Sequence, residues 1–297
     1  MIAVTGATGY VGGAVARRLA ERGVEQRLVV RDPSRAPELP GAEVRQASAY
    51  GAGEEMRAAL EGADSIFLVP AAESEDRVEQ HRTAVDAAAA AGVERIVYLS
   101  FLNASPDATF TLVRHHWATE ERVRESGVPF TFLRMSIYLD FLPMMIGDDG
   151  AIRGPADEGR VAFVHRDDVA DVAAAVLTSD GHDGETYDLT GRELLTMHDV
   201  AEQISEATGR DASFHDETLD EAWESRRATG APDWMIEGWV TSYQAIAEGE
   251  LDVVSDSVNR LAGHEPITLR EYLAGERLAL ARAARQAPRL TGSTCRP

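Results

Sequence analysis

Three glycines near the start of the chain are the first residues whose type and spacing indicate chemistry. Gly6, Gly9 and Gly12 follow an apolar run over Ile2–Thr5 and precede a helical pattern over 11–22. Glycine lets a backbone approach a phosphate closely, and a helix N-terminus offers unpaired N–H groups. Strand, glycine turn and helix in this order predict a cradle for the pyrophosphate of a dinucleotide, although the spacing is G-x-x-G-x-x-G and not G-x-G-x-x-G. A tight turn that binds no ligand is the alternative.

The charge at the end of the second expected strand, 26–31, bears on the choice of dinucleotide. An acidic residue there would bind the ribose 2′-hydroxyl and select NAD. This chain has Arg31 there, and Arg35 follows four residues later. Because a guanidinium can pair with a 2′-phosphate, we expect NADP(H) to be preferred over NAD(H). An ordinary surface arginine after a strand, or one paired with Asp32, is the alternative.

The composition excludes several chemistries. All 29 basic residues are arginines against 50 acidic residues, which gives a net charge of −21. Without lysine, Schiff-base chemistry, a P-loop lysine and a Tyr-Lys proton relay are impossible. An acidic chain repels nucleic acid and anionic membranes. One cysteine, Cys295, rules out a disulfide framework and a Cys-rich metal site, so we expect no metal.

The chain lacks the sequence patterns of secretion and of membrane insertion. The first residues lack the basic and long apolar regions of a signal peptide, and no apolar stretch approaches the ~20 residues of a membrane span. We therefore expect a cytoplasmic protein with a small-molecule substrate and neither nucleic-acid nor membrane partners. It is expected to be a monomer or a homodimer.

Strands alternate with helices in the first half of the chain. Strands are expected at 2–5, 26–31, 65–69, 95–100 and 130–134, and helices at 11–22, 76–91 and 115–125. This order predicts an α/β protein with a Rossmann-type doubly wound parallel sheet and a smaller C-terminal α/β portion. The expected division is a dinucleotide-binding domain at 1–135, a substrate-side portion at 136–285 and a flexible tail at 286–297. Residues 161–180 are expected to return to the first sheet.

The second half is less regular. Residues 147–159 are rich in turn formers and are expected to be exposed, and short strands are expected at 161–164 and 186–189 with a helix at 168–177 between them. Thr196 is expected to cap a helix that runs to about residue 208.

Several segments together resemble a known family. They are TGATGYVG at 5–12, RDPSRA at 31–36, DAAAAAGVERIVYLS at 86–100, SGVPFTFLR at 126–134 and HRDDVADVAAAVL at 165–177. The chain resembles, from residue 1 to about 280, the NmrA-like branch of the atypical short-chain dehydrogenases/reductases. Within that branch it looks most like the NAD(P)H:quinone oxidoreductase type.

The resemblance implies further site residues. The pyrophosphate would be held by Gly6, Thr8, Gly9, Tyr10, Val11 and Gly12, and the 2′-phosphate by Arg31. Val69 and Pro70 would border the adenosine or ribose, Ser100 and Phe101 would face the nicotinamide, and Arg134 to Tyr138 would lie beside the nicotinamide and substrate. These positions follow expected strand ends, where ligands of such sheets bind.

Two departures from the family pattern matter. The Tyr-x-x-x-Lys pair is absent, and the acidic residue often found after the third strand is replaced around Gln46–Ser48. Alcohol or ketone reduction needs a proton donor near neutral pH, whereas a reduced quinone can take its proton from solvent. We therefore expect NADPH-dependent hydride transfer to a quinone-like electrophile. A non-catalytic regulator that senses NADP(H), of the NmrA type, is the alternative.

Candidates near the substrate come from one helix and one strand end. Tyr138 is the best-placed tyrosine to touch substrate and the one candidate for proton delivery, but it is equally an ordinary half-buried aromatic. Phe101 is expected to touch the electrophile together with Tyr138, and His115 and Trp117 could line the cleft. His116 and Glu120 share a helix face, and a hydrogen-bonded pair is the simpler interpretation than a metal pair.

Overall fold

A parallel sheet forms the centre of the molecule. The computed structural model describes residues 1–275, so the expected tail at 286–297 lies outside the described residues. Within them, seven strands pair in the order β3-β2-β1-β4-β5-β6-β8, and every pairing is parallel. Their bounds are β1 Ile2–Thr5, β2 Gln26–Val30, β3 Ala42–Gln46, β4 Ser65–Leu68, β5 Arg95–Phe101, β6 Phe130–Met135 and β8 Thr186–Leu189.

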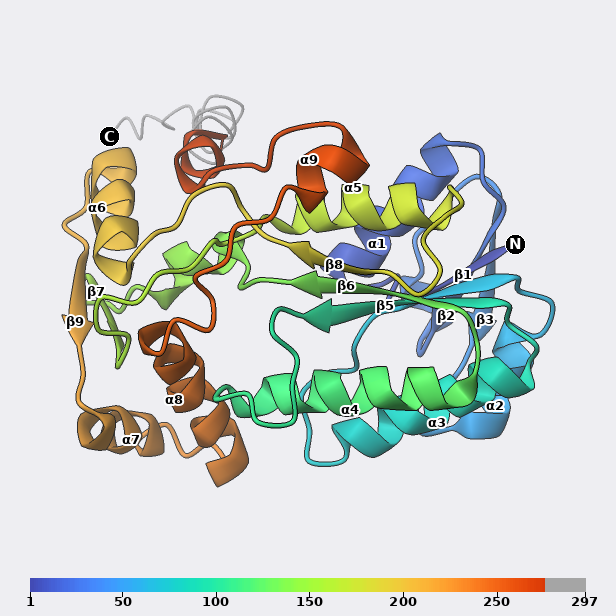
Figure 1. Ribbon diagram of the computed structural model, residues 1–297, viewed down its shortest axis with the longest axis horizontal. Coiled ribbons are helices and arrows are strands. Elements are labelled where there is room, and N and C mark those ends of the chain that lie inside the picture. The colour runs from blue at the N-terminus through green and yellow to red at the C-terminus, as the bar shows by residue number, and fades with distance from the viewer. Residues whose placement is uncertain (276–297) are drawn as a thin grey trace, which may run out of the picture.

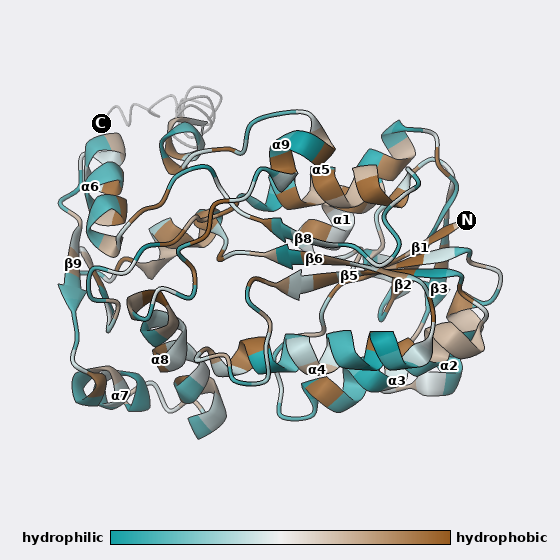
Figure 2. Cartoon of the chain, viewed as in Figure 1, coloured by the Kyte–Doolittle hydropathy of each residue, from teal (hydrophilic) through white to brown (hydrophobic). Residues whose placement is uncertain are grey.

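Helices cover both faces of this sheet (Figure 1). One face carries α1 (Tyr10–Glu21), α5 (Arg166–Leu177) and α9 (Ser257–Ala262), and the other carries α2 (Gly53–Leu60), α3 (Arg77–Ala90) and α4 (Thr111–Ser126). Because both faces are covered, the central strands are continuous apolar runs, which Figure 2 shows as a hydrophobic band between two layers of amphipathic helices. The expected Rossmann-type doubly wound sheet is confirmed.

The order in which the chain adds strands to the sheet reverses between β1 and β4. From β1 the chain builds outward through β2 and β3, and it then crosses back to add β4, β5 and β6 on the other side. The connections after β1 and β4 therefore leave toward opposite faces and open a crevice beyond the carboxyl ends of these strands, where ligands of such sheets bind.

The rest of the described chain lies beyond that edge. It contains the 3₁₀ segments η1 (Pro33–Arg35) and η2 (Leu139–Met145), the parallel strand pair β7 (Ala151–Gly154) and β9 (Ser213–Asp216), and helices α6 (Met197–Thr208), α7 (Leu219–Arg227) and α8 (Asp233–Ala247). Thr196 caps α6 in a capping box with Asp199, as expected. No helix among the described residues is long and apolar enough to cross a membrane.

Two expectations for the second half are wrong. Residues 161–164 are not a strand, because Val161 bridges Leu195 in antiparallel fashion while Val164 bridges Tyr138 in parallel fashion, and two separate partners build no ladder. Residues 147–159 are not simply exposed, because β7 lies within them and Ile152 is fully buried against the C-terminal elements. The expected division near residue 135 stays a prediction. Two elements from beyond that point, α5 and β8, pack against α1 and β6 of the first half.

Candidate functional site

The glycine turn has the geometry of an anion cradle. Gly6 has φ +64°, and a Cβ on Gly12 would lie 2.4 Å from the Gly6 carbonyl oxygen, so both positions require glycine. The Gly9 N–H donates to that same oxygen at 2.8 Å and closes the turn. Helix α1 then begins at Tyr10 with no side-chain cap and no acidic residue in its first turn, which leaves its first N–H groups free for an anionic ligand.

The end of β4 is fixed beside this cradle. Thr5 Oγ1 donates to the Phe67 carbonyl at 3.0 Å and accepts from the Val69 N–H at 2.9 Å. The hydroxyl of Tyr50, which comes from the segment after β3, donates to the Val69 carbonyl at 2.5 Å. Burial raises the pKa of Tyr50, so its hydroxyl remains a neutral donor. The sequence expectation included Val69 but missed Tyr50.

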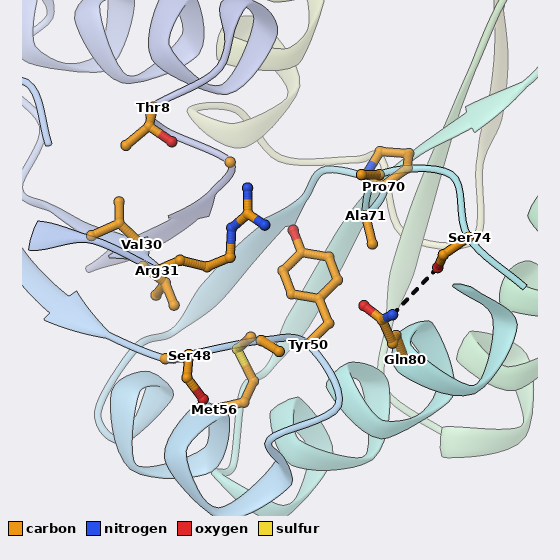
Figure 3. A pocket seen from close by; sticks show the side chains of 15 residues that line it. Thr8, Val30, Arg31, Ser48, Tyr50, Met56, Pro70, Ala71, Ser74 and Gln80 are labelled. Carbon is orange, nitrogen blue, oxygen red and sulfur yellow. Dashed lines mark hydrogen bonds between the residues drawn. The ribbon is translucent and has the colours of Figure 1, made fainter. Parts of the chain in front are cut away.

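A cavity of about 370 Å³ adjoins the cradle and the ends of β2, β3 and β4 (Figure 3). It brings together four of the expected site residues, Gly6, Thr8, Arg31 and Pro70. The lining residues that the sequence expectation missed are Val29, Val30, Ala47, Ser48, Ala49, Tyr50, Met56, Ala71, Ala72, Ser74 and Gln80. Apolar walls with a few directed polar groups, next to an anion cradle, suit the adenosine half of a dinucleotide.

Arg31 lines this cavity, whereas Arg35, the second expected cation, lies in η1 and is not among the lining residues. Arg31 is exposed, its guanidinium extends into the cavity in Figure 3, and it forms no ion pair with any residue in 1–275. Asp32 does not pair with the Arg31 guanidinium. Its carboxylate instead accepts from the Ser34 hydroxyl at 2.7 Å and from the Ser34 N–H at 3.0 Å. These hydrogen bonds hold the pKa of Asp32 below its ordinary value. A free cation beside a cradle for phosphate is what a 2′-phosphate requires.

A second group of residues joins the cradle to the segment η2. The Arg166 guanidinium lies 4.0 Å from the ring centroid of Tyr10 and 4.7 Å from that of Phe141, and it forms an ion pair with Asp140. Tyr138 packs edge-on against Phe141 with centroids 5.8 Å apart. Nothing in the spacing of the sequence connects Arg166 with Tyr10, so this contact was missed.

This group leaves apolar surface exposed next to the cradle. The side chains of Phe141 and Met144, three residues apart on the same 3₁₀ face, are 39% and 75% exposed. Tyr138 is half-buried, as expected, and desolvation of its hydroxyl raises the pKa of that group. We call Tyr10, Tyr138, Phe141, Met144 and Arg166 the η2 platform.

Ser100 and Arg134 turn their side chains toward α4. Both bind the fully buried carboxylate of Glu120, Ser100 Oγ at 2.6 Å and Arg134 Nε and Nη2 at 2.9 and 2.7 Å, while Arg124 adds a contact at 3.0 Å. The side chains expected to touch cofactor are therefore engaged in an internal ion pair. The assignment of Ser100 and Arg134 to the cofactor stays a prediction. Their backbone groups, and not their side chains, would make that contact.

His116 and Glu120 do not pair with each other. His116 Nδ1 lies 3.0 Å from the Tyr98 hydroxyl and its Nε2 lies 3.5 Å from Arg77. Because Arg77 can only donate, Nε2 is the acceptor and Nδ1 carries the proton. Burial, followed by the charge of Arg77, lowers the pKa of His116 well below its ordinary value. Within residues 1–275, no three His, Cys, Asp or Glu side chains are placed to hold a metal ion.

None of the other expected substrate residues, Phe101, His115 and Trp117, lines the cavity beside the glycine cradle. Phe101 is 7% exposed and packs edge-on against Phe110, whereas Trp117 is half-buried on α4 beside the Arg124 guanidinium. His115 has a buried Nδ1 with no hydrogen-bond partner in the described part of the chain, and burial lowers its pKa. Their role at the substrate stays a prediction.

Comparison with known proteins places the chain in a family. The NmrA-like family matches residues 1–273, and this chain belongs to it. Quinone oxidoreductase 2 of Escherichia coli is 32% identical over 279 residues, which are 91% of this chain and 96% of that one. The crystal structure of the Escherichia coli NADPH-dependent quinone oxidoreductase in complex with NADPH covers 93% of this chain and 100% of its own, with a TM-score of 0.86.

Two further relatives have other names. The (4-alkanoyl-5-oxo-2,5-dihydrofuran-3-yl)methyl phosphate reductase of Streptomyces griseus is 37% identical over 283 residues, 92% of this chain and 97% of that one. The triphenylmethane reductase of Citrobacter sp., crystallised with NADP(H), is 31% identical, covers 93% of this chain and 99% of its own, and has a TM-score of 0.82. The resemblance expected from the sequence is confirmed.

Proposed function

We propose that this chain is an NADPH-dependent oxidoreductase that transfers a hydride to a small, conjugated, quinone-like electrophile. The observation that carries the proposal is the placement of the glycine cradle and the unpaired cation Arg31 on one cavity. Within residues 1–275, more than half of the arginines form an ion pair with a carboxylate, and Arg31 does not, so its guanidinium is available to an anionic ligand.

The printed names of the relatives support the acceptor class. A quinone, a triphenylmethane dye and an alkanoyl-dihydrofuranone phosphate are all electron-poor conjugated systems. Such acceptors take a hydride at carbon and delocalise the electron pair, so proton delivery need not coincide with hydride transfer. This matches a chain that has no lysine for a proton relay.

Each part of the site has a separate task in this proposal. NADPH, when bound, supplies the hydride; Gly6, Gly9 and Gly12 with the start of α1 would hold its pyrophosphate, and Arg31 its 2′-phosphate. The η2 platform offers apolar and aromatic surface for a flat acceptor. The chain contributes orientation and exclusion of water from one side of the acceptor.

No side chain of the platform is poised as an acid. Desolvation moves the pKa of Tyr138 further above neutral pH, which makes its hydroxyl a weak proton donor. Outside the platform, the Ser100 hydroxyl is engaged by Glu120. The reduced acceptor would therefore take its proton from solvent. This predicts a turnover rate that changes little between pH 6 and 8.

Steady-state oxidation of NADPH with 1,4-benzoquinone and 1,4-naphthoquinone tests the proposal. We expect each quinone to accelerate the loss of nicotinamide absorbance far beyond a control with heat-inactivated protein. If NADPH binds tightly and no quinone accelerates its oxidation, the enzyme hypothesis is rejected in favour of the cofactor-sensing regulator.

A further inference from the structure

Gln80 is a polar side chain of the cavity that the proposed function has not used. It projects from α3 into the cavity, on the wall opposite the ends of β2 and β3. Its Nε2 donates to Asp76 Oδ1 at 2.8 Å and to Ser74 Oγ at 3.4 Å. The other half of the amide, Oε1, has no partner in the described residues.

The orientation of this amide is determined by chemistry. An ionised carboxylate only accepts hydrogen bonds, so the atom of Gln80 that contacts Asp76 must be the nitrogen. Ser74 Oγ also donates to Asp76, at 2.7 Å, and these hydrogen bonds hold the pKa of Asp76 below its ordinary value. Asp76 is therefore charged near neutral pH. In Figure 3 the Gln80 nitrogen accordingly faces Ser74, and the oxygen lies on the side of Tyr50.

The neighbouring polar groups are already engaged. The Tyr50 hydroxyl donates to Val69, and the Ser48 N–H donates to Glu55 at 2.7 Å. The Ser48 hydroxyl can donate or accept, so it discriminates little between ligands. Much of the remaining lining is apolar, from Ala47, Met56, Pro70 and Ala71. The cavity thus offers an apolar slot with a fixed hydrogen-bond acceptor on its α3 side.

A dinucleotide held by the glycine cradle and Arg31 would place its purine in this slot, because the 2′-phosphate and the base are attached to the same ribose. The exocyclic amino group of adenine is a donor, and a glutamine amide is a common partner for it. We infer, on the basis of the proposed function, that Gln80 Oε1 determines the base specificity of the site by accepting from this amino group. The acceptor comes from α3 in a chain with no carboxylate at 46–48 after β3.

Hypoxanthine tests this assignment because it replaces the amino group by a carbonyl oxygen. Two acceptors would then face each other, and neither would be satisfied. We expect the wild-type chain to bind NADPH about fivefold to tenfold more tightly than reduced nicotinamide hypoxanthine dinucleotide phosphate. Both dissociation constants are measured by fluorescence titration of the nicotinamide, which requires no turnover.

Three variants sharpen the experiment. Gln80→Met keeps the length of the side chain and removes the acceptor, so its ratio of the two dissociation constants should fall to about 1. Asp76→Asn no longer fixes the amide, so its ratio should fall part of the way, with hypoxanthine binding improved. Gln244→Met, on α8 and outside this cavity, should keep the wild-type ratio.

The outcomes separate this inference from the proposed function. Equal affinity of the wild type for both nucleotides would overturn the inference, and so would a Gln80→Met variant that keeps the full ratio. Because the ratio is taken within one protein, partial unfolding of a variant does not alter it. If Gln80→Met loses the discrimination between the two nucleotides and the wild type reduces no quinone, the inference is supported and the proposed enzymatic function is rejected. No binding of either nucleotide would overturn both.

Discussion

The two sides of the crevice are built differently. On the cofactor side, regular strands end at one edge, and their connections are pinned by directed hydrogen bonds such as those of Thr5 and Tyr50. On the side where we propose that the electron acceptor binds, called the acceptor side below, the chain forms a 3₁₀ segment and isolated bridges, and it leaves Phe141 and Met144 exposed.

This difference matches two kinds of ligand. A phosphate group of fixed shape and charge is recognised by backbone geometry, which tolerates little displacement. A flat apolar acceptor is held by contact area, which several side chains share. Substitutions on the cofactor side should therefore act sharply, and those on the acceptor side gradually.

Gly12→Ala is the strongest way to break the cofactor side. Its Cβ would lie 2.4 Å from the Gly6 carbonyl oxygen, so the turn or the start of α1 must move. We expect NADPH affinity to fall about 100-fold, or about 3 kcal/mol, by calorimetric titration. Gly275→Ala, whose Cβ would meet nothing within 4 Å, is the control. Affinity within threefold of wild type would show that the cradle tolerates displacement.

Arg31→Gln separates charge recognition from the rest of the cofactor side. Loss of a charge-assisted contact to the 2′-phosphate should weaken NADPH about 30-fold, near 2 kcal/mol, and leave NADH within about twofold. Arg35→Gln, in η1, should have a smaller effect. Equal loss for NADPH and NADH would refute the role at the 2′-phosphate.

His81 makes the cofactor side sensitive to acid. Its Nε2 accepts from the Ala71 N–H at 2.9 Å, and burial together with Arg77 lowers its pKa from 6.5 to about 3. Below pH 6.5 the unfolded chain binds a proton that the folded chain does not, so stability falls as the pH drops from 6.5 toward 3. At pH 5 this amounts to about 2 kcal/mol.

His81→Gln lacks this titration and can still accept from Ala71. Urea unfolding of both proteins at pH 8 and pH 5 should show the variant losing about 2 kcal/mol less than the wild type. If the unfolding free energies of the two proteins fall equally between pH 8 and pH 5, then folding does not lower the pKa of His81 and the prediction fails.

Phe141→Ala should have the smallest effect. Removing one ring of the η2 platform should raise the KM for naphthoquinone about fivefold, since the ring is 39% exposed before an acceptor covers it, and leave the Kd for NADPH unchanged. Trp239→Ala, 36% exposed on α8, is a matched control. A changed NADPH affinity would show that the two sides are coupled through Arg166.

The sequence predicts regular, buried elements best. The strands β1, β4, β5 and β6 are short apolar runs, and the helices between them end at glycines such as Gly127, so run length and flanking turn residues identify these elements. Strand β3 escaped prediction because it alternates charge and lies half exposed at the sheet edge, and α2 is only two turns long. Residues 161–164 form an apolar run that resembles a strand, but Val161 and Val164 bridge Leu195 and Tyr138, which lie far apart in the chain.

The same distinction applies to the site. The glycines and Arg31 follow strands directly, so local order predicts them. Tyr50 and Gln80 reach the cavity from other segments, and only the assembled sheet brings them to Val69 and Arg31. The one local signal for Gln80 was its position four residues after Asp76 at the start of a helix, which permits the contact that orients it.

The bridge between Tyr138 and Val164 brings the two ends of one excursion together. The Leu139 N–H donates to the Val164 carbonyl at 3.0 Å, and the Val164 N–H donates to the Ile137 carbonyl at 3.0 Å. The segment from residue 139 to residue 163 therefore begins and ends at neighbouring positions in the fold. Length and sequence can therefore vary between residues 139 and 163 without moving the strand ends that border the glycine cradle, because the two ends of the segment stay joined by these hydrogen bonds.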